Sequence, residues 1–440
     1  MSNVTSHMLD FNTKPSTILH IDLNSCFATI EQQANPHLRG KPVAVAAYVT
    51  PNGCILAPSI EAKRYGVQTG MRVKDGKLLC PHLIVLSPDP WKYRNVHLEL
   101  RKILKDYTND FNPKSIDEFV LNLDGYPCIR SEKWDMRSGM FEVGNEIKKR
   151  IKKEVGEWLT VSIGIAPNRF LAKLASSLHK PDGLDEINKD NFLETYKNLE
   201  LTDLCGIKTQ NAARLSSMGI YSVLDFYNSP IWKLKAAFSS IVGYYWHTRL
   251  HGYELDDVVF GRRSYGNSYA LPASPYGGQG GPKPFVTPEE LAPILSKLVT
   301  KMGARLRRAG YKATGIHLAI SYRDGSYWHK GVSYPKVFFD SRDIYKEAFK
   351  MLSLTPAKKP VRTLAVSVFN LLSSSQIQLE LFDDIEKKES AVKAVDEINE
   401  RWGEYVVTSA RMLSAKDYVP DRIAFGNVKE LEEFTISLVD

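Results

Sequence analysis

Apolar residues follow two alternating spacings through the first 185 residues of the chain. Runs with the continuous or alternating apolar pattern of buried strands occupy 17–23, 41–49, 119–125 and 159–166. Segments with helical spacing occupy 25–33, 56–66, 92–108, 139–155 and 168–178. Because strands and helices interleave, this part of the chain is expected to form an α/β or α+β sheet domain.

The pattern changes after this region. Residues 190–255 read as short helices joined by turns, and a linker is expected at 256–263. A loop rich in Gly and Pro (273–285) precedes a second series of elements. That series is an amphipathic helix at 287–309, strands at 316–322 and 330–336, a helix at 341–352, a strand at 361–370 and, in the tail, a helix at 388–401.

Length and composition set broad limits. A chain of 440 residues suits roughly two to four domains. Its net charge of +8 fits a binder of polyanions or an ordinary basic cytosolic protein equally well. No run of about 18 apolar residues and no signal-peptide pattern occurs, so no membrane span is expected. The five cysteines are widely spaced and form no C-x-x-C pair, which favours reduced thiols over a structural zinc site.

Two acidic motifs lie at strand ends. Asp22 lies in IDLNSCFA (21–28), and Asp117 and Glu118 lie in SIDEF (115–119). Carboxylates are the hard oxygen ligands that Mg²⁺ prefers, so together the motifs suggest a metal site. Neighbouring residues of a regular strand point to opposite faces. Asp117 and Glu118 are therefore expected to share a site only if the strand is irregular there, for example at its first residue.

These motifs, in this order, resemble the Y-family (translesion) DNA polymerases of bacteria. The resemblance continues through IEAKRYGV (60–67), VSIGIAPNRFLAKLASSLHKPDG (161–183), the helical segment near 200–220 and the later β-α-β-β-α-β unit. It implies an α+β right-hand polymerase with a ferredoxin-like palm. The implied division is palm 17–33 and 92–188, fingers 34–91, thumb 189–255, linker 256–263, little finger 264–375 and C-terminal tail 376–440.

The resemblance also implies the chemistry. Asp22 and Asp117 match the acids that bridge two Mg²⁺ ions, Glu118 matches a ligand of the ion that activates the primer 3′-hydroxyl, and the Leu23 carbonyl matches a further ligand. The reaction would be attack of that hydroxyl on the α-phosphate of a deoxynucleoside triphosphate, with primer-template DNA as partner. The setting implied is the bacterial cytoplasm, at the nucleoid.

Further residues match binding roles in that family. Phe27 matches the steric gate that excludes a 2′-hydroxyl, and Lys180 matches a lysine that meets the triphosphate. Lys63 stands where the family usually has Arg, and Ile60 where it has Tyr, so the triphosphate grip is expected to differ. Gly206 and Lys208 match a helix-hairpin-helix that holds DNA phosphates.

Three features leave alternatives open. The basic rows 148–153 and 297–308 are expected to be solvated helix faces, with phosphate contact as the alternative. Gln378, Leu379, Leu381 and Phe382 resemble the peptide that docks on a bacterial sliding clamp, while an edge strand would also fit. An inactive adaptor and a palm-domain nucleotide cyclase remain as alternative functions; the intact acids argue against the first, and the duplex-gripping segments argue against the second.

Overall fold

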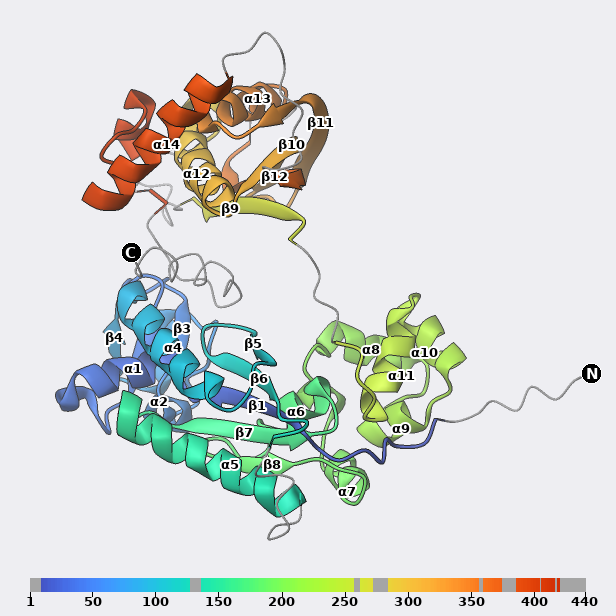
Figure 1. Ribbon diagram of the computed structural model, residues 1–440. Helices are drawn as coiled ribbons and strands as arrows, with labels where there is room; N and C mark the ends of the chain where they lie inside the picture. The colour runs from blue at the N-terminus through green and yellow to red at the C-terminus, as the bar shows by residue number, and fades with distance from the viewer. Residues whose placement is uncertain are drawn as a thin grey trace, which may run out of the picture. The chain divides into compact units, whose positions relative to one another are not determined.

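The computed structural model describes residues 9–126, 136–256, 262–271, 284–355, 359–373, 385–403, 405–415 and 418–419. The chain divides into two compact units at residues 258–259 (Figure 1). Each unit has its own sheet and its own hydrophobic core.

A five-stranded sheet in the order β5-β6-β1-β7-β8 forms the centre of the first unit. Its strands are β1 (Ile18–Leu23), β5 (Phe111–Pro113), β6 (Glu118–Asn122), β7 (Val161–Ala166) and β8 (Leu184–Glu186). The central strand β1 pairs antiparallel with β6 and β7. Five of its six residues are buried, which confirms the prediction of a strand covered on both faces.

Helices cover both faces of this sheet. The helices that accompany it are α1 (Cys26–Ala34), α4 (Pro90–Lys105), α5 (Met136–Arg150) and α6 (Arg169–Ala175). The alternate β1 residues Leu19, Ile21 and Leu23 pack into a core with α4 and α5. The opposite face, which carries Ile18, packs against α6. His20 and Asp22 share this second face because side chains alternate along a strand.

A second, three-stranded sheet in the order β3-β2-β4 belongs to the same unit. Its elements are β2 (Val43–Ala46), β3 (Ile55–Pro58), α2 (Ile60–Arg64), α3 (Val73–Leu79) and β4 (Ile84–Leu86). The prediction of one helix over 56–66 is wrong at its start, because residues 55–58 form a strand. The helix starts only after Ser59, whose hydroxyl accepts a hydrogen bond from the Ala62 amide at 3.2 Å.

Helices continue through the rest of the first unit. They are α7 (Phe192–Lys197), α8 (Thr209–Ser217), α9 (Val223–Asn228), α10 (Ile231–Phe238) and α11 (Val242–Leu250). Their apolar side chains share a core with α6. The predicted helix over 139–155 differs from the structure at both ends. The α-helix α5 already begins at Met136 and ends at Arg150, and a π-helix continues it over Ile151–Val155.

The second unit has a four-stranded sheet in the order β11-β10-β12-β9. Its elements are β9 (Ser264–Ala270), α12 (Pro288–Arg308), β10 (Tyr311–Tyr322), β11 (Tyr327–Phe338), α13 (Ser341–Ser353) and β12 (Val361–Ser373). This is the predicted β-α-β-β-α-β order. The apolar residues of α12 and α13 form one core with the sheet.

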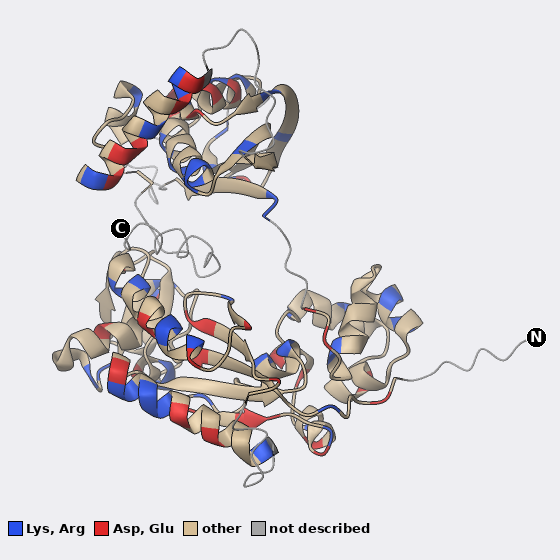
Figure 2. Ribbon diagram, viewed as in Figure 1, with Lys and Arg blue, Asp and Glu red and all other residues tan. Residues whose placement is uncertain are grey.

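The C-terminal tail is part of this second core. Helix α14 (Ile385–Trp402) carries acidic and basic residues along its length (Figure 2), and a 3₁₀-helix (Ala410–Ala415) follows it. The expectation that Lys297 is solvated is wrong. Lys297 is only 6% exposed, and its ammonium donates hydrogen bonds to the carbonyls of Ala415 and Tyr418. On the next turns of α12, Arg307 and Arg308 pair with Asp396 and Glu400 of α14.

The clamp-like residues 378–382 lie outside the described residues. Within the described ranges, every helix is too short or too polar to cross a bilayer.

Candidate active site

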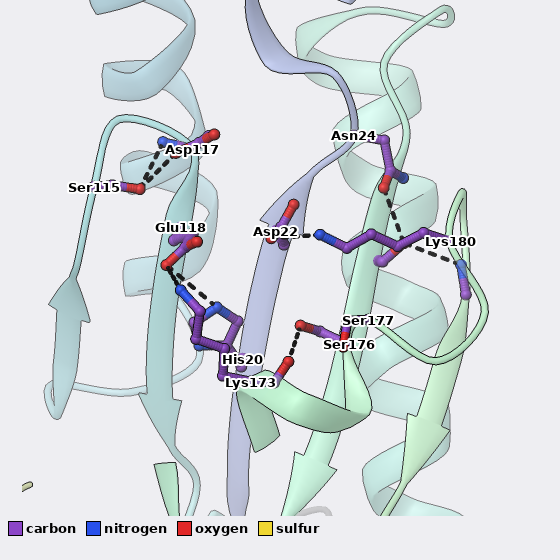
Figure 3. Close-up of polar contacts among 12 residues, drawn as sticks. His20, Asp22, Asn24, Ser115, Asp117, Glu118, Lys173, Ser176, Ser177 and Lys180 are labelled. Atoms are coloured by element: carbon purple, nitrogen blue, oxygen red, sulfur yellow. Dashed lines mark hydrogen bonds and ion pairs between the residues drawn. The ribbon is translucent and has the colours of Figure 1, made fainter. Parts of the chain in front are cut away.

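The pairing of β1 with β6 brings the predicted carboxylates together. Asp22 lies opposite Glu118 in the antiparallel register, so their side chains share one face. Asp117 directly precedes β6, and its carbonyl accepts a hydrogen bond from the Leu23 amide at 2.9 Å. This bond continues the register of the Asp22–Glu118 pair, so the irregularity expected at the start of β6 is not seen in the pairing with β1. Asp117 lines the same cavity as Asp22, whereas Glu118 is not among the lining residues. Figure 3 shows Asp22, Asp117 and Glu118 at the ends of these two neighbouring strands.

That cavity has a volume of about 580 Å³ and lies between the two sheets of the first unit. The end of β1 and the turns beside it contribute one wall, and β3 and α2 contribute another. The lining residues are Asp22, Leu23, Asn24, Ser25, Cys26, Leu56, Ala57, Pro58, Ile60, Lys63, Arg64, Thr69, Asp117, Lys180 and Pro181. The wall that carries Asp22 and Asp117 thus faces a largely apolar wall that also carries Lys63 and Arg64.

Two lysines hold the carboxylates. The Lys180 ammonium lies 2.6 Å from Asp22 Oδ2, and the Lys173 ammonium lies 2.5 Å from Glu118 Oε2. Sequence reasoning identified Lys180 but missed Lys173, which is in α6. The signal available was its place in FLAKLAS, four residues after Arg169, the first residue of α6.

Burial raises the pKa of both aspartates. Burial, and then the charges of Asp22 and Glu118, raise the pKa of the Asp117 carboxyl to about 6. The hydrogen bond that Ser115 donates to this carboxyl opposes the shift in pKa. Burial also raises the pKa of Asp22, and the Lys180 ammonium opposes this rise. Clustered carboxylates that resist ionisation are stabilised by added positive charge, so they fit divalent cations.

His20 belongs to the same cluster and was not predicted. One ligand atom each from His20, Asp22 and Glu118 can be chosen so that all lie within 4.8 Å of one another. His20 is 2% exposed, and burial, with Lys173 and Lys180 nearby, lowers its pKa to about 3. It is therefore a neutral imidazole at pH 7. The available signal was its position two residues before Asp22, on the same strand face.

Phe27 lies in α1 and is fully buried. Its ring stacks on Tyr93 with centroids 4.2 Å apart. The preceding residue, Cys26, lines the cavity, while Phe27 is not among the lining residues. The predicted steric gate is therefore a core residue next in sequence to a lining residue, and it does not itself line the cavity.

Asn24 ties the end of β1 to the neighbouring strand. Its amide donates to Thr160 Oγ1 at 3.2 Å and accepts from Ser162 Oγ at 3.0 Å. A carboxylate at this position could not donate the first of these bonds.

The fingers-like wall carries the remaining cations. Lys63 lines the cavity from α2, and burial together with Lys180 lowers its pKa. Arg64 lines the same cavity, and sequence reasoning missed it although it directly follows Lys63. Ile60 also lines the wall and offers only apolar contact. The wall therefore has a guanidinium one residue later than the resembling family would place it.

Gly206 and Lys208 lie apart from this cavity. Gly206 has φ +101°, a left-handed conformation that glycine adopts without a Cβ penalty. Lys208 is the N-cap residue of α8. The turn between them therefore leads from a short 3₁₀-helix (Leu201–Asp203) into α8, and the predicted contact with DNA phosphates stays a prediction.

Comparison with known proteins identifies the family. A model described as the impB/mucB/samB family matches residues 21–177, and its C-terminal domain model matches residues 281–381. DNA polymerase IV of Pelotomaculum thermopropionicum is 30% identical over 92% of this chain and 97% of its own length. DNA polymerase IV of Moorella thermoacetica is 32% identical over 90% of this chain and 96% of its own length.

The fold agrees with these matches. A solved Y-family DNA polymerase chimera superposes with a TM-score of 0.68 at 22% identity, covering 81% of this chain and 99% of that one. Two independent domain models, long relatives and the fold all give one assignment. The chain therefore belongs to the impB/mucB/samB family, that is, to the Y-family of translesion DNA polymerases.

Proposed function

We propose that the cavity lined by Asp22 and Asp117 is where the chain adds a deoxynucleotide to a primer 3′-hydroxyl on a DNA template, damaged templates included. The observation that supports this most is the convergence of Asp22, Asp117 and Glu118 at the junction of β1 and β6. Three carboxylates meet there beside four cationic side chains: Lys63, Arg64, Lys173 and Lys180. Such a site suits a polyphosphate substrate and positive counter-charge.

The family assignment implies dependence on a divalent metal, and we propose two Mg²⁺ ions. Asp22 and Asp117 would hold both ions, with Glu118 and the Leu23 carbonyl completing the protein ligands. Bound ions would lower the pKa of the primer hydroxyl and stabilise charge on the leaving pyrophosphate. Burial raises the pKa of both aspartates because it disfavours their charged forms, and bound cations would offset that cost. This supports the fit of the carboxylates to metal ions.

The lysines then have separate tasks. Lys180 pairs with Asp22 at 2.6 Å and is 36% exposed, so it can exchange this partner for a triphosphate oxygen. Lys63 and Arg64 reach the cavity from the opposite wall. We assign the triphosphate grip to these three residues. Arg64 supplies the planar fork that Lys63 lacks.

We propose that Phe27 is the steric gate. Stacking on Tyr93 holds the Phe27 ring in one orientation, next in sequence to Cys26. A rigid ring there supports a cavity wall that leaves no room for a 2′-hydroxyl. The wall would then select deoxyribose by repulsion.

We propose the palm, fingers, thumb and little-finger division of the sequence analysis, with the thumb hairpin at Gly206 and Lys208 holding DNA phosphates. We also propose that Gln378, Leu379, Leu381 and Phe382 dock on a bacterial sliding clamp. The support for the clamp is the sequence pattern and its position after the second sheet unit.

Primer extension tests the proposal. The protein should extend a labelled primer on a template in the presence of Mg²⁺, and the double variant Asp117→Ala, Glu118→Ala should not. An inactive adaptor would fail in both forms, and a cyclase would convert nucleotides without any template. Extension that persists in the double variant would refute the assignment of the carboxylates.

A further inference from the structure

Lys180 lies on a short turn between α6 and β8, residues 179–183, which we call the Lys180 turn. The Lys180 ammonium forms an ion pair with Asp22. Because the side chain is flexible, the position of its backbone in the turn limits which other groups the ammonium can reach. What fixes that backbone is therefore relevant to nucleotide binding. The fixing contacts come from helix α5 and from β7, not from the turn itself.

Lys148 of α5 makes the principal contact. Its ammonium donates to the carbonyl of Asp182 at 2.5 Å and to the carbonyl of Gly183 at 3.3 Å, and it lies 3.0 Å from Asp182 Oδ1. Two hydrogen bonds to backbone carbonyls and one ion pair thus hold the Lys148 ammonium. The Lys148 side chain is only 14% exposed, which distinguishes it from a solvated surface pair.

A second lysine supports the same residue. Lys152, in the π-helix that continues α5, donates to Asp182 Oδ2 at 2.9 Å. Asp182 has φ +61°, in the left-handed region that non-glycine residues rarely adopt. Local contacts must hold such a conformation, and the two lysines supply them. The basic cluster of α5, seen along the helix in Figure 2, thus has a structural task at its C-terminal end.

The turn is also tied to the metal-binding strand. The Gly183 amide donates to Ser162 Oγ at 3.3 Å, and Ser162 in turn donates to Asn24 at 3.0 Å. Asn24 follows Leu23 at the end of β1. The Asp182–Gly183 end of the turn is therefore held from two sides, by α5 and, through Ser162, by the residue that follows the carboxylate strand.

We infer that Lys148 is a positioning residue for the incoming nucleotide. It would not touch the substrate; it holds Asp182 and Gly183 so that Lys180 presents its ammonium to the triphosphate. The inference deepens the proposed function and rests on the assignment of Lys180 as a triphosphate ligand. Lys152 assists through the Asp182 carboxylate.

The test uses the full chain, four single variants around the anchor, Lys180→Met, and the double variant Lys148→Met, Lys180→Met. Lys148→Met removes the anchor, Lys148→Arg keeps a charge, and Lys149→Met is a matched control at an exposed position on the same helix. Asp182→Asn keeps a residue that tolerates the left-handed conformation while removing the ion pair. Steady-state extension gives KM for the nucleotide and kcat, inhibition by pyrophosphate reports the triphosphate site, and melting temperature reports the fold.

We expect Lys148→Met to raise nucleotide KM on the order of 10-fold and to weaken pyrophosphate inhibition in parallel, because small misplacements of a binding group are costly. Lys148→Arg should recover part of this loss. Asp182→Asn should show a smaller rise in KM, and Lys149→Met should match the wild type. In a Lys180→Met background, Lys148→Met should add little, since the two residues act through one contact.

Two outcomes would overturn the inference. One is a Lys148→Met protein with wild-type KM and pyrophosphate inhibition while Lys180→Met raises KM. The other is a KM effect of Lys148→Met that is undiminished in the Lys180→Met background, which would indicate general distortion. If Lys180→Met itself leaves KM unchanged, the proposed triphosphate role of Lys180 fails first.

Discussion

Gly164 offers a sharp test of how packing supports the site. It lies on β7 beneath α6, the helix that carries Lys173 and leads into the Lys180 turn. A Cβ at this position would lie 2.0 Å from the Ala172 carbonyl oxygen and 2.2 Å from the Ser176 amide nitrogen. Both atoms belong to the backbone of α6 or of the residue that ends it. No side-chain rotation can relieve the overlap.

In Gly164→Ala, α6 must move away by roughly 1.5 Å to restore ordinary contact distances. Overpacking of this kind costs about 1–3 kcal/mol, which corresponds to a fall in melting temperature of roughly 2–12 °C for a unit of this size. The 2.5 Å contact between Lys173 and Glu118 would be lost with the shift. Because a displacement of about 1 Å can reduce catalysis by about 10²-fold, we expect extension to fall well beyond the loss of folded protein.

Gly144→Ala is the matched control. A Cβ there would meet only the end of the Leu184 side chain, at 2.8 Å, and that side chain can rotate. Thermal melting and single-nucleotide extension of the two variants, measured below both melting temperatures, separate the effects. A Gly164→Ala protein that melts and extends like the wild type would refute the reasoning.

Three further predictions follow from the same structure. Phe27→Ala should insert ribonucleotides in a primer-extension assay, and unchanged sugar selection would count against Phe27 as the steric gate. Because the Phe27 ring is buried, its removal should also lower the free energy of unfolding by about 3–5 kcal/mol, so the assay is run at low temperature. Burial lowers the pKa of His97 and His247 to about 4 in the folded protein, whereas the same side chains in the unfolded chain have pKa values of about 6.5. As the pH falls below about 6.5, the unfolded chain therefore binds protons that the folded protein does not, and each histidine should lower the free energy of unfolding by about 2 kcal/mol at pH 5. Urea denaturation measures this loss, and an equal loss in His247→Phe would contradict the reasoning. Replacing Leu381 and Phe382 with Ala should abolish stimulation by a sliding clamp, and persistent stimulation would exclude the docking role.

The active-site strands were predictable because their signals are local. The apolar run before Asp22 and the acid pair at the start of the next strand are read from a few neighbouring residues. The long helix over 287–309 was predictable for the same reason, since its apolar spacing and its Thr287 cap lie within one segment. The strand at 55–58 was missed because a four-residue apolar run next to a helix has too few residues to show a period.

Contacts between residues far apart in the sequence could not be predicted from local patterns. His20 and Lys173 join the carboxylates only because β1, β6 and α6 pack together. Lys297 looked like a solvated cation, but it is buried because the tail supplies the Ala415 and Tyr418 carbonyls more than 100 residues later.

The amino-acid sequence alone determined the order of the elements, the family and the three carboxylates proposed to bind metal, because each rests on residues close together in the chain. Only the tertiary structure decided how these groups are held: Glu118 by Lys173 of α6, and the Lys180 turn by Lys148 of α5. Ion pairs and hydrogen bonds across 34 to 55 residues of chain leave no periodic trace in the sequence. They exist once the sheet register and the packing of the helices bring the partners within 3 Å.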